Sequence, residues 1–167
     1  AQIPHLLLLL IPRHPERFDE VAVAVRSRGL KGHRRSSGDA GSETQVYLAD
    51  SMGEMLLLLS ACDLVLVGGS LVAHGGHNPI EPAALGKATL TGPHHFNFAA
   101  IVDSLQQHKA LAQVSDDPDT LYEQLLQYLQ DDDLRQRMGE AGMKVVEDNR
   151  GAVGRLVELS AGYLRLS

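Results

Sequence analysis

The stretch that decides the fold reads Leu64–Val65–Leu66–Val67–Gly68–Gly69–Ser70. Its consecutive apolar residues are typical of a strand that is buried on both faces, as strands of parallel sheets are. The two glycines allow the chain to turn sharply where the strand ends. Further glycines follow up to Gly76, and a short helix is predicted over residues 79–85, with Gly86 past its end. A strand, a glycine-rich loop and a helix in this order indicate an α/β fold.

Outward from this stretch, strands and helices alternate along the chain. Strands are predicted over residues 6–11, 46–48, 64–67, 88–91 and 110–114, and helices over residues 15–28, 52–61, 79–85, 98–107 and 119–129. Asp117 is predicted to cap the last of these helices and Asp133 to cap another, which Gly151 interrupts before a final segment to Leu164. We expect residues 6–11 to form a buried strand. The alternation predicts one domain over residues 1–167, with a mostly parallel sheet and helices on both faces.

Composition limits the classes of function. The 167 residues, 44% of them hydrophobic, suffice for one domain with a full core. Lys and Arg number 15 against 21 Asp and Glu, and this net charge of -6 argues against bulk nucleic-acid binding, which needs a basic face. The single cysteine, Cys62, cannot form an internal disulfide, so a reducing compartment is expected.

We expect the apolar run at residues 6–11 to be neither a membrane span nor a signal peptide. It is too short for a bilayer, which takes about 20 apolar residues. It also lacks the basic first segment and the cleavage site of a signal peptide. Because the chain opens almost directly on a strand, we interpret it as an excised domain, with a processed full-length protein as the alternative.

Three loops hold the unusual residues, and each follows a predicted strand: residues 12–17, 50–54 and 68–82. The carboxyl ends of parallel strands meet at one edge of a sheet, and ligands bind there. We therefore expect the three loops to converge.

The glycine-rich loop predicts an anion site. Gly75 and Gly76 lead into a helix, and free N–H groups at a helix start attract a phosphate. Prolines in the first turn remove some donors, so Ser70 and the glycine N–H groups would contribute more. The alternative is that the glycines only make a tight connection. The spacing matches neither the dinucleotide fingerprint GxGxxG nor the P-loop lysine motif.

Two charged side chains complete the predicted edge. Glu81 lies in the first turn of the predicted helix, where a carboxylate can accept hydrogen bonds from both hydroxyls of a ribose. The alternative is that it only complements the helix dipole. Arg13 emerges at the end of the first strand, and its guanidinium suits a phosphate or carboxylate. A pair with Glu16 or another surface acid is the alternative, and Arg17 is expected to make such a pair or to remain a solvated charge.

The remaining histidines and basic residues are assigned no site. A metal site is the minor interpretation of four nearby histidines, because no acidic partner is fixed beside them: His74, His77, His94 and His95. A basic cluster is interpreted as solvated surface, with anionic lipid headgroups as the alternative: Arg26, Arg28, Lys31, His33, Arg34 and Arg35.

Five short motifs, in order and spacing, resemble a known family. They read Pro-Arg-His-Pro-Glu-Arg-Phe at 12–18, Met-Gly-Glu at 52–54, Val-Gly-Gly-Ser-Leu at 67–71, Gly-Gly-His-Asn-Pro-Ile-Glu-Pro at 75–82 and Gly-Pro-His-His-Phe-Asn-Phe at 92–98. Together they resemble the Kdo transferases of Gram-negative bacteria, which are GT-B glycosyltransferases. The resemblance covers the C-terminal, donor-binding half of such enzymes, so it implies a Rossmann-like domain.

The resemblance implies an activity. The family transfers 3-deoxy-D-manno-octulosonic acid (Kdo) from CMP-Kdo to the lipid A precursor in lipopolysaccharide biosynthesis, at the cytoplasmic side of the inner membrane. It displaces CMP with inversion and uses no cofactor. The general base belongs to an N-terminal domain absent from this chain, so we expect no catalytic residue here and donor binding without turnover.

The resemblance also assigns eight substrate-binding residues: Arg13, Met52, Gly53, Ser70, Gly75, Gly76, Asn78 and Glu81. Arg13 would meet the phosphate or the sugar carboxylate, and the backbone around Met52 and Gly53 would contact the nucleotide. Ser70 and the glycines would hold the phosphate, Asn78 would belong to the donor site, and Glu81 would bind the ribose. Where the family has Gly-Asp-Thr before Met52, this chain has Ala-Asp-Ser at 49–51, and alanine adopts a positive φ less readily than glycine.

Two other classes of protein remain open at this stage. One is a GT-B transferase or epimerase that uses a UDP-sugar. The other is a non-catalytic nucleotide-binding or assembly module.

Overall fold

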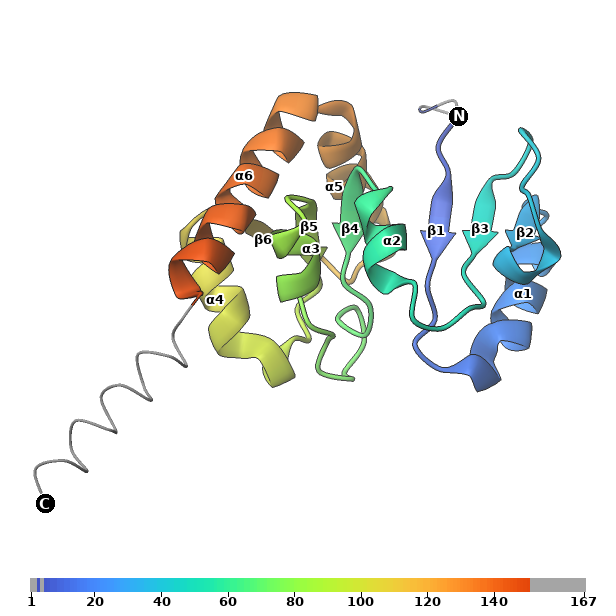
Figure 1. Ribbon diagram of the computed structural model, residues 1–167, viewed down its shortest axis with the longest axis horizontal. Helices are drawn as coiled ribbons and strands as arrows, with labels where there is room; N and C mark the ends of the chain where they lie inside the picture. The colour runs from blue at the N-terminus through green and yellow to red at the C-terminus, as the bar shows by residue number, and fades with distance from the viewer. Residues whose placement is uncertain (1–2, 4, 151–167) are drawn as a thin grey trace, which may run out of the picture. The chain divides into compact units, whose positions relative to one another are not determined.

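The computed structural model describes residue 3 and residues 5–150 (Figure 1). The predicted segment from Gly151 to Leu164 lies outside the described residues. The chain divides into two compact units, Ala1–Leu58 and Leu59–Ser167, and each is described by itself. The assignment of residues 1–167 to one domain stays a prediction.

The first unit is built on a parallel three-stranded sheet. Strands β1 (Leu8–Leu10), β2 (Gly32–Arg34) and β3 (Val46–Leu48) lie in the order β1-β3-β2, with Val46 opposite both Leu8 and Gly32. The short 3-10 helix η1 (Pro15–Arg17) leads into α1 (Phe18–Ser27), and η2 (Arg35–Ser37) follows β2. Helix α1 buries Ala22 and Val25, which are one turn apart and share one face. Gly32 lies under this face, since a Cβ there would be 2.8 Å from Val25 Cγ1.

Two expectations for this unit were wrong. Within the apolar run at residues 6–11, Leu8–Leu10 form a parallel strand, but Leu8 is 48% exposed and Leu9 and Leu10 are only partly buried, so the strand is not fully buried. In its own sheet β1 is an edge strand and has one strand neighbour. Strand β2 was not predicted at all, because its residues Gly32–Arg34 include no apolar side chain and its pairing to β3 is made by the backbone.

The second unit contains another parallel three-stranded sheet, ordered β4-β5-β6. Its strands are β4 (Leu64–Leu66), β5 (Ala88–Thr91) and β6 (Leu111–Gln113). Its helices are α3 (Ile80–Ala84), α4 (Ala99–Gln107), α5 (Pro118–Gln130) and α6 (Asp132–Asn149), with η3 (Phe96–Phe98) before α4. All residues of the central strand β5 are buried. Because successive residues of a strand face opposite sides, both faces of this sheet are covered at β5.

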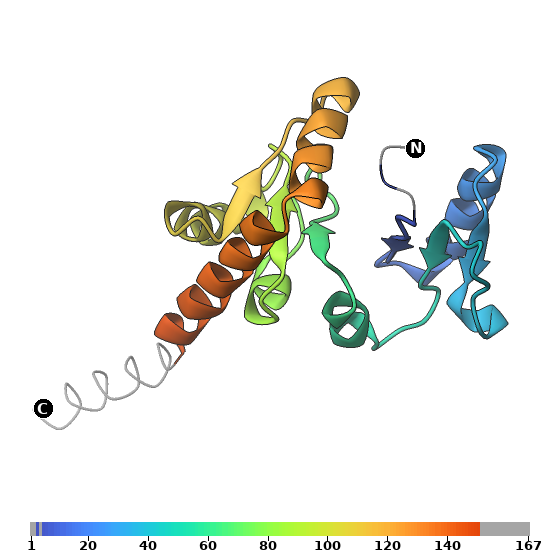
Figure 2. The same ribbon diagram turned by 90° about the horizontal axis from the view of Figure 1, so that it is seen from above.

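The core of this unit has two parts. In one, Ala83 of α3, Val102 and Leu105 of α4 and Val145 of α6 pack with Leu111 of β6. In the other, Ala88 and Leu90 of β5 pack with Val114 and Met138, and with the partly buried apolar side chains of α5. Figure 2 shows α6 as the long helix that crosses the unit, and it contributes to both parts.

Glycines set how closely α6 approaches the turn between α3 and β5. A Cβ on Gly139 would lie 2.0 Å from the carbonyl oxygen of Gly86, and a Cβ on Gly142 would lie 3.2 Å from the Cα of Ala83. Backbone therefore packs on backbone at this crossing, and no side chain larger than hydrogen fits at Gly139 without movement.

The start of α2 and the capping residue of α6 differ from the predictions, and local backbone geometry explains both differences. Helix α2 runs over Met55–Ser60 and contains the division between the units, whereas the prediction began it at Met52. Gly53 has φ +83°, which a right-handed helix cannot accommodate, so the helix begins later. Asp117 caps α5 as predicted by accepting from the N–H of Thr120. The cap of α6 is Asp131, which accepts from the N–H of Leu134 at 2.8 Å, so the prediction of Asp133 was wrong.

Within the residues that the structure describes, none of the helices combines the length and the apolar character required to cross a membrane.

Candidate functional site

In the second unit, the predicted site residues lie in the loop that follows β4 and in the first turn of α3, and this loop contacts the loop that follows β5. Ser70 joins these loops, and its side chain is fully buried. The Ser70 hydroxyl donates to the carbonyl of Val67 at 2.6 Å and accepts from the N–H of Gly92 at 2.8 Å. The Ser70 carbonyl accepts from the N–H of His94 at 2.9 Å. Ser70 therefore fastens the loop after β4 to the loop after β5, and its predicted phosphate contact stays a prediction.

Gly75 and Gly76 are buried and lie in left-handed backbone conformations, with φ +87° and +75°. A Cβ on Gly75 would lie 2.2 Å from Nδ2 of Asn97, and the Gly75 carbonyl accepts from the Asn97 N–H at 3.2 Å. The N–H of Gly76 donates to the carbonyl of Gly69 at 3.0 Å. Both positions thus need glycine for conformation and for space, as the tight-connection alternative expects. A phosphate contact by their N–H groups stays a prediction.

The loop continues through His77 and Asn78 into α3. The His77 ring packs on the turn at Gly68 and Gly69, since a Cβ on Gly68 would lie 3.3 Å from its Cδ2. Oδ1 of Asn78 accepts from the N–H of Ile80 at 3.0 Å and so holds the entry to the helix.

Glu81 lies in the first turn of α3 and is partly buried. Among the described residues the structure gives its carboxylate no hydrogen-bond or ion-pair partner. Both carboxylate oxygens are therefore available to accept from a ligand.

The histidines of these loops have separate partners. Nε2 of His94 lies 3.4 Å from Oδ2 of Asp116, and Nδ1 of His95 lies 2.9 Å from the carbonyl oxygen of Gly92. In the described part of the chain, no group of three or more His, Cys, Asp or Glu side chains is placed to hold a metal ion.

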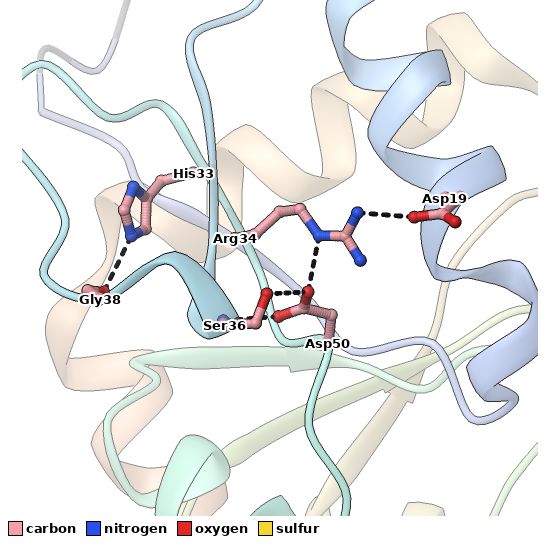
Figure 3. Close-up of polar contacts among 6 residues, drawn as sticks. All are labelled: Asp19, His33, Arg34, Ser36, Gly38 and Asp50. Atoms are coloured by element: carbon pink, nitrogen blue, oxygen red, sulfur yellow. Dashed lines mark hydrogen bonds and ion pairs between the residues drawn. The ribbon is translucent and has the colours of Figure 1, made fainter.

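In the first unit, the loop over residues 50–54 is tied to β2 and η2 (Figure 3). The carboxylate of Asp50 is only 1% exposed and lies 2.6 Å from Nε of Arg34. It also accepts from the N–H of Ser36 at 2.8 Å and from the Ser36 hydroxyl at 2.6 Å. Burial raises the pKa of Asp50, but the hydrogen bonds from Ser36 and the Arg34 guanidinium outweigh it and hold the pKa at about 2.

The other end of this loop is held by a second arginine. Arg35 makes a bidentate contact with Glu54, at 3.2 Å from Nε to Oε2 and 2.8 Å from NH2 to Oε1. The Ser51 hydroxyl also donates to Oε2 of Glu54. The hydrogen bond from Arg35, followed by that from Ser51, lowers the pKa of Glu54 to about 2.

Arg26, Arg28, Lys31 and Arg35 of the basic cluster are exposed, as the interpretation of a solvated surface expects, but three of the six basic residues are also paired with acids. Lys31 lies 2.8 Å from Glu43, Arg34 pairs with Asp19 and Asp50 at 2.6 Å each, and Arg35 pairs with Glu54. Pairs between residues far apart in the sequence cannot be deduced from the run of basic residues alone.

Ala49 lies in an ordinary backbone conformation although the resembling family has glycine there. It is fully buried, and its N–H donates to the carbonyl of Leu10 at 2.9 Å. Among the described residues, the non-glycine positions with positive φ are His5 and Lys109. The alanine therefore causes no strain at the start of this loop.

Arg13 is exposed in the loop between β1 and η1. Beside it, His14 lies 3.7 Å from Glu16, and Arg17 lies 3.1 Å from Glu20, which confirms that Arg17 makes a surface pair. Arg13, Met52 and Gly53 thus belong to one unit, and Ser70, Gly75, Gly76, Asn78 and Glu81 to the other. In each unit the residues follow the carboxyl ends of parallel strands, and the convergence of all three loops stays a prediction.

A hollow between α5 and α6 contains none of these residues. It is lined by Glu123, Gln127, Asp131 and Asp133, together with their neighbours on the two helices. Its acidic lining is unsuited to a phosphate.

Comparison with known proteins decides the family. Residues 34–145 match the family model for glycosyl transferases group 1, which is more than half of the chain. The chain belongs to the group 1 glycosyl transferases. Two curated relatives of this glycosyl transferase are named 3-deoxy-D-manno-octulosonic acid transferase. One, from Haemophilus influenzae, is 44% identical over 165 residues, and the other, from Bordetella pertussis, is 40% identical over 167 residues. The matches cover 98% of this chain, but the chain spans only 39% of each relative's length.

Solved structures agree with this family. The C-terminal CMP-Kdo binding domain of WaaA from Acinetobacter baumannii is 39% identical, with a TM-score of 0.79 over 84% of this glycosyl transferase chain and 74% of that domain. Spinosyn forosaminyltransferase SpnP, at 16% identity and a TM-score of 0.55, shares the fold. The predictions of a Rossmann-like GT-B C-terminal domain and of kinship with the Kdo transferases are confirmed.

Proposed function

We propose that this chain is the donor-binding domain of a glycosyltransferase that moves Kdo from CMP-Kdo to a lipid A precursor. The observation that carries the proposal is the 39% identity to a domain named for CMP-Kdo binding, over 74% of that domain. The named activity of the longer relatives supports the reaction.

Within this proposal, the predicted donor-binding residues of each unit have the following roles. In the first unit, Arg13 meets the charged part of the donor, and the backbone of Met52 and Gly53 contacts the nucleotide. In the second unit, Ser70, Gly75 and Gly76 hold the phosphate, Asn78 belongs to the donor site, and the carboxylate of Glu81 accepts from the ribose hydroxyls. The hydrogen bonds at Ser70 and Asn97 favour this loop for binding, because a fixed loop loses little entropy when a ligand arrives.

The proposed reaction needs residues that this chain does not supply. Displacement of CMP with inversion requires a base that deprotonates the acceptor hydroxyl, and we place that base in the remainder of the longer enzyme. Acceptor binding and work at the cytoplasmic face of the inner membrane also belong to the whole enzyme. This chain then binds the donor and does not turn it over.

Calorimetric titration with CMP and with UMP tests the proposal. CMP is expected to bind, and UMP is expected to bind more weakly, because the two bases differ at the exocyclic group and at N3. Tighter binding of UMP would assign the domain to a UDP-sugar enzyme. If neither nucleotide binds, the domain would be assigned as a non-catalytic assembly module.

A further inference from the structure

The loop over residues 50–54 is anchored at both ends and open in the middle. At its start, the Asp50 carboxylate is 1% exposed and accepts hydrogen bonds from Arg34 and from Ser36. At its end, the Glu54 carboxylate is clamped by both Nε and NH2 of Arg35. Figure 3 shows the first of these anchors, in which one guanidinium reaches Asp50 and Asp19 together.

The middle of the loop faces open space. Met52 is 64% exposed, and a Cβ on Gly53 would meet no atom within 4 Å. Gly53 nevertheless has φ +83°, so the tip is turned into a defined conformation and does not extend a helix or strand. The Ser51 hydroxyl donates to Glu54 and so links the two ends of the loop locally.

The two arginines that hold the loop are adjacent in the sequence and lie where β2 ends and η2 begins. Arg34 is the last residue of β2 and Arg35 is the first of η2. They reach 16 and 19 positions along the chain to Asp50 and Glu54. Strand β2 pairs with β3, and the loop over residues 50–54 follows β3. The two arginines at the end of β2 therefore hold the ends of this loop against the sheet.

We propose that Arg34 and Arg35 are positioning residues that hold the Met52–Gly53 tip ready for the nucleotide without touching it. This inference rests on the proposed function, since it takes the tip as the nucleotide contact. Arg34 holds the carboxylates of Asp50 and Asp19, and Arg35 holds that of Glu54, with planar, directional hydrogen bonds that a lysine cannot reproduce. The ordering of the loop is then complete before the ligand arrives, and the ligand binds without that entropic cost.

The substitution Arg35→Gln in this chain tests the proposal. The Arg35 side chain is 41% exposed, so the variant is expected to fold. Its Kd for CMP should rise about fivefold, because about 1 kcal/mol of loop ordering is then required on binding. Hydrogen exchange of the amides of residues 51–54 should quicken without ligand, while exchange in β5 stays unchanged. Arg35→Lys should give an intermediate Kd.

Lys31→Gln is the matched control. Lys31 precedes the same strand at its other end and makes a comparable ion pair with Glu43, at 2.8 Å. This variant should keep both the Kd for CMP and the exchange rates at 51–54. An equal loss of affinity in Lys31→Gln would overturn the proposal, because any weakened pair in the unit would then act alike.

A double-mutant cycle with Glu54→Gln separates positioning from direct contact. If Arg35 acts only through Glu54, the double variant should bind CMP no more weakly than either single variant. Additive losses, or a loss of affinity with unchanged exchange at 51–54, would mean that Arg35 touches the ligand and would refute positioning. If the unaltered chain fails to bind CMP, the proposed function fails; if it binds CMP and Arg35→Gln binds equally well, only the positioning role fails.

Discussion

Ser70 shows how one hydroxyl can be used for structure at a position where ligand chemistry was expected. The sequence suggests a phosphate contact because Ser70 follows two glycines at a strand end. The structure buries the side chain and engages its hydroxyl with Val67 and Gly92. The partner Gly92 is distant in the sequence, so burial of this serine could not be predicted from its neighbours. Glu81, in contrast, lies in the first turn of the helix as predicted, and its ribose contact stays a prediction.

Glu81→Gln tests the ribose contact at the scale of one residue. The amide keeps the shape of the side chain but turns one acceptor into a donor, so CMP binding should weaken by about 1–3 kcal/mol. Deoxy-CMP lacks one ribose hydroxyl, and the substitution should matter less for it. Calorimetry with both ligands and both proteins gives the coupling. Equal losses for the two ligands, together with a lower melting temperature, would make Glu81 a charge that complements the helix dipole.

Asp50 predicts a pH dependence of stability. Its folded-state pKa of about 2 lies below the ordinary value of 3.8, so its contribution is present above about pH 4 and is lost as the pH falls through the folded value. The loss amounts to about 2 kcal/mol between neutral pH and pH 2. Glu54 titrates with the same sign.

Urea unfolding of the unaltered chain and of Asp50→Asn, at pH 6 and near pH 2, measures this contribution. The fall in unfolding free energy should be smaller in Asp50→Asn by about 2 kcal/mol. The two proteins would show the same fall if the Arg34 and Ser36 contacts gave Asp50 no preference for the charged form.

At the scale of elements, apolar pattern predicted the strands that have buried side chains. The predicted bounds of β3 and β5 agree with the structure, and their residues are mostly or wholly buried. Strand β2 has no such pattern, because Gly32, His33 and Arg34 include no apolar side chain, and it joins the sheet by backbone pairing with β3. The start of α2 was misplaced because the left-handed turn at Gly53 is decided by the anchored loop.

Gly139→Ala tests the close approach of α6 to the turn before β5. Alanine favours a helix by about 1 kcal/mol over glycine, but its Cβ would lie 2.0 Å from the Gly86 carbonyl oxygen. Backbone must then shift, and we expect a net loss of about 2 kcal/mol of unfolding free energy. Gly41→Ala is the control, since a Cβ there meets no atom within 4 Å. A Gly139→Ala protein that is as stable as the control would contradict the packing described for α6.

At the scale of the whole molecule, the family motifs predicted more than physical patterns alone could. Alternating strands and helices indicate an α/β fold, and the glycines between a strand and a helix predict an anion site, but neither distinguishes a cytidine donor from a uridine donor. The five family motifs made that distinction as a resemblance; the family match shows membership of the group 1 glycosyl transferases, and the cytidine donor stays a proposal. The predicted convergence of the three loops depends on the relative placement of the two units, which the pattern of strands and helices in the sequence does not specify.

The measurement that tests the central claim most directly is an amide chemical-shift map of this chain titrated with CMP. If the domain holds the cytidine nucleotide of a sugar donor, shifts should concentrate at Arg13, at residues 51–54 and at residues 68–82. UMP at the same concentration should shift these amides less. Shifts confined to the acidic hollow between α5 and α6, or no shifts at saturating CMP, would contradict the account.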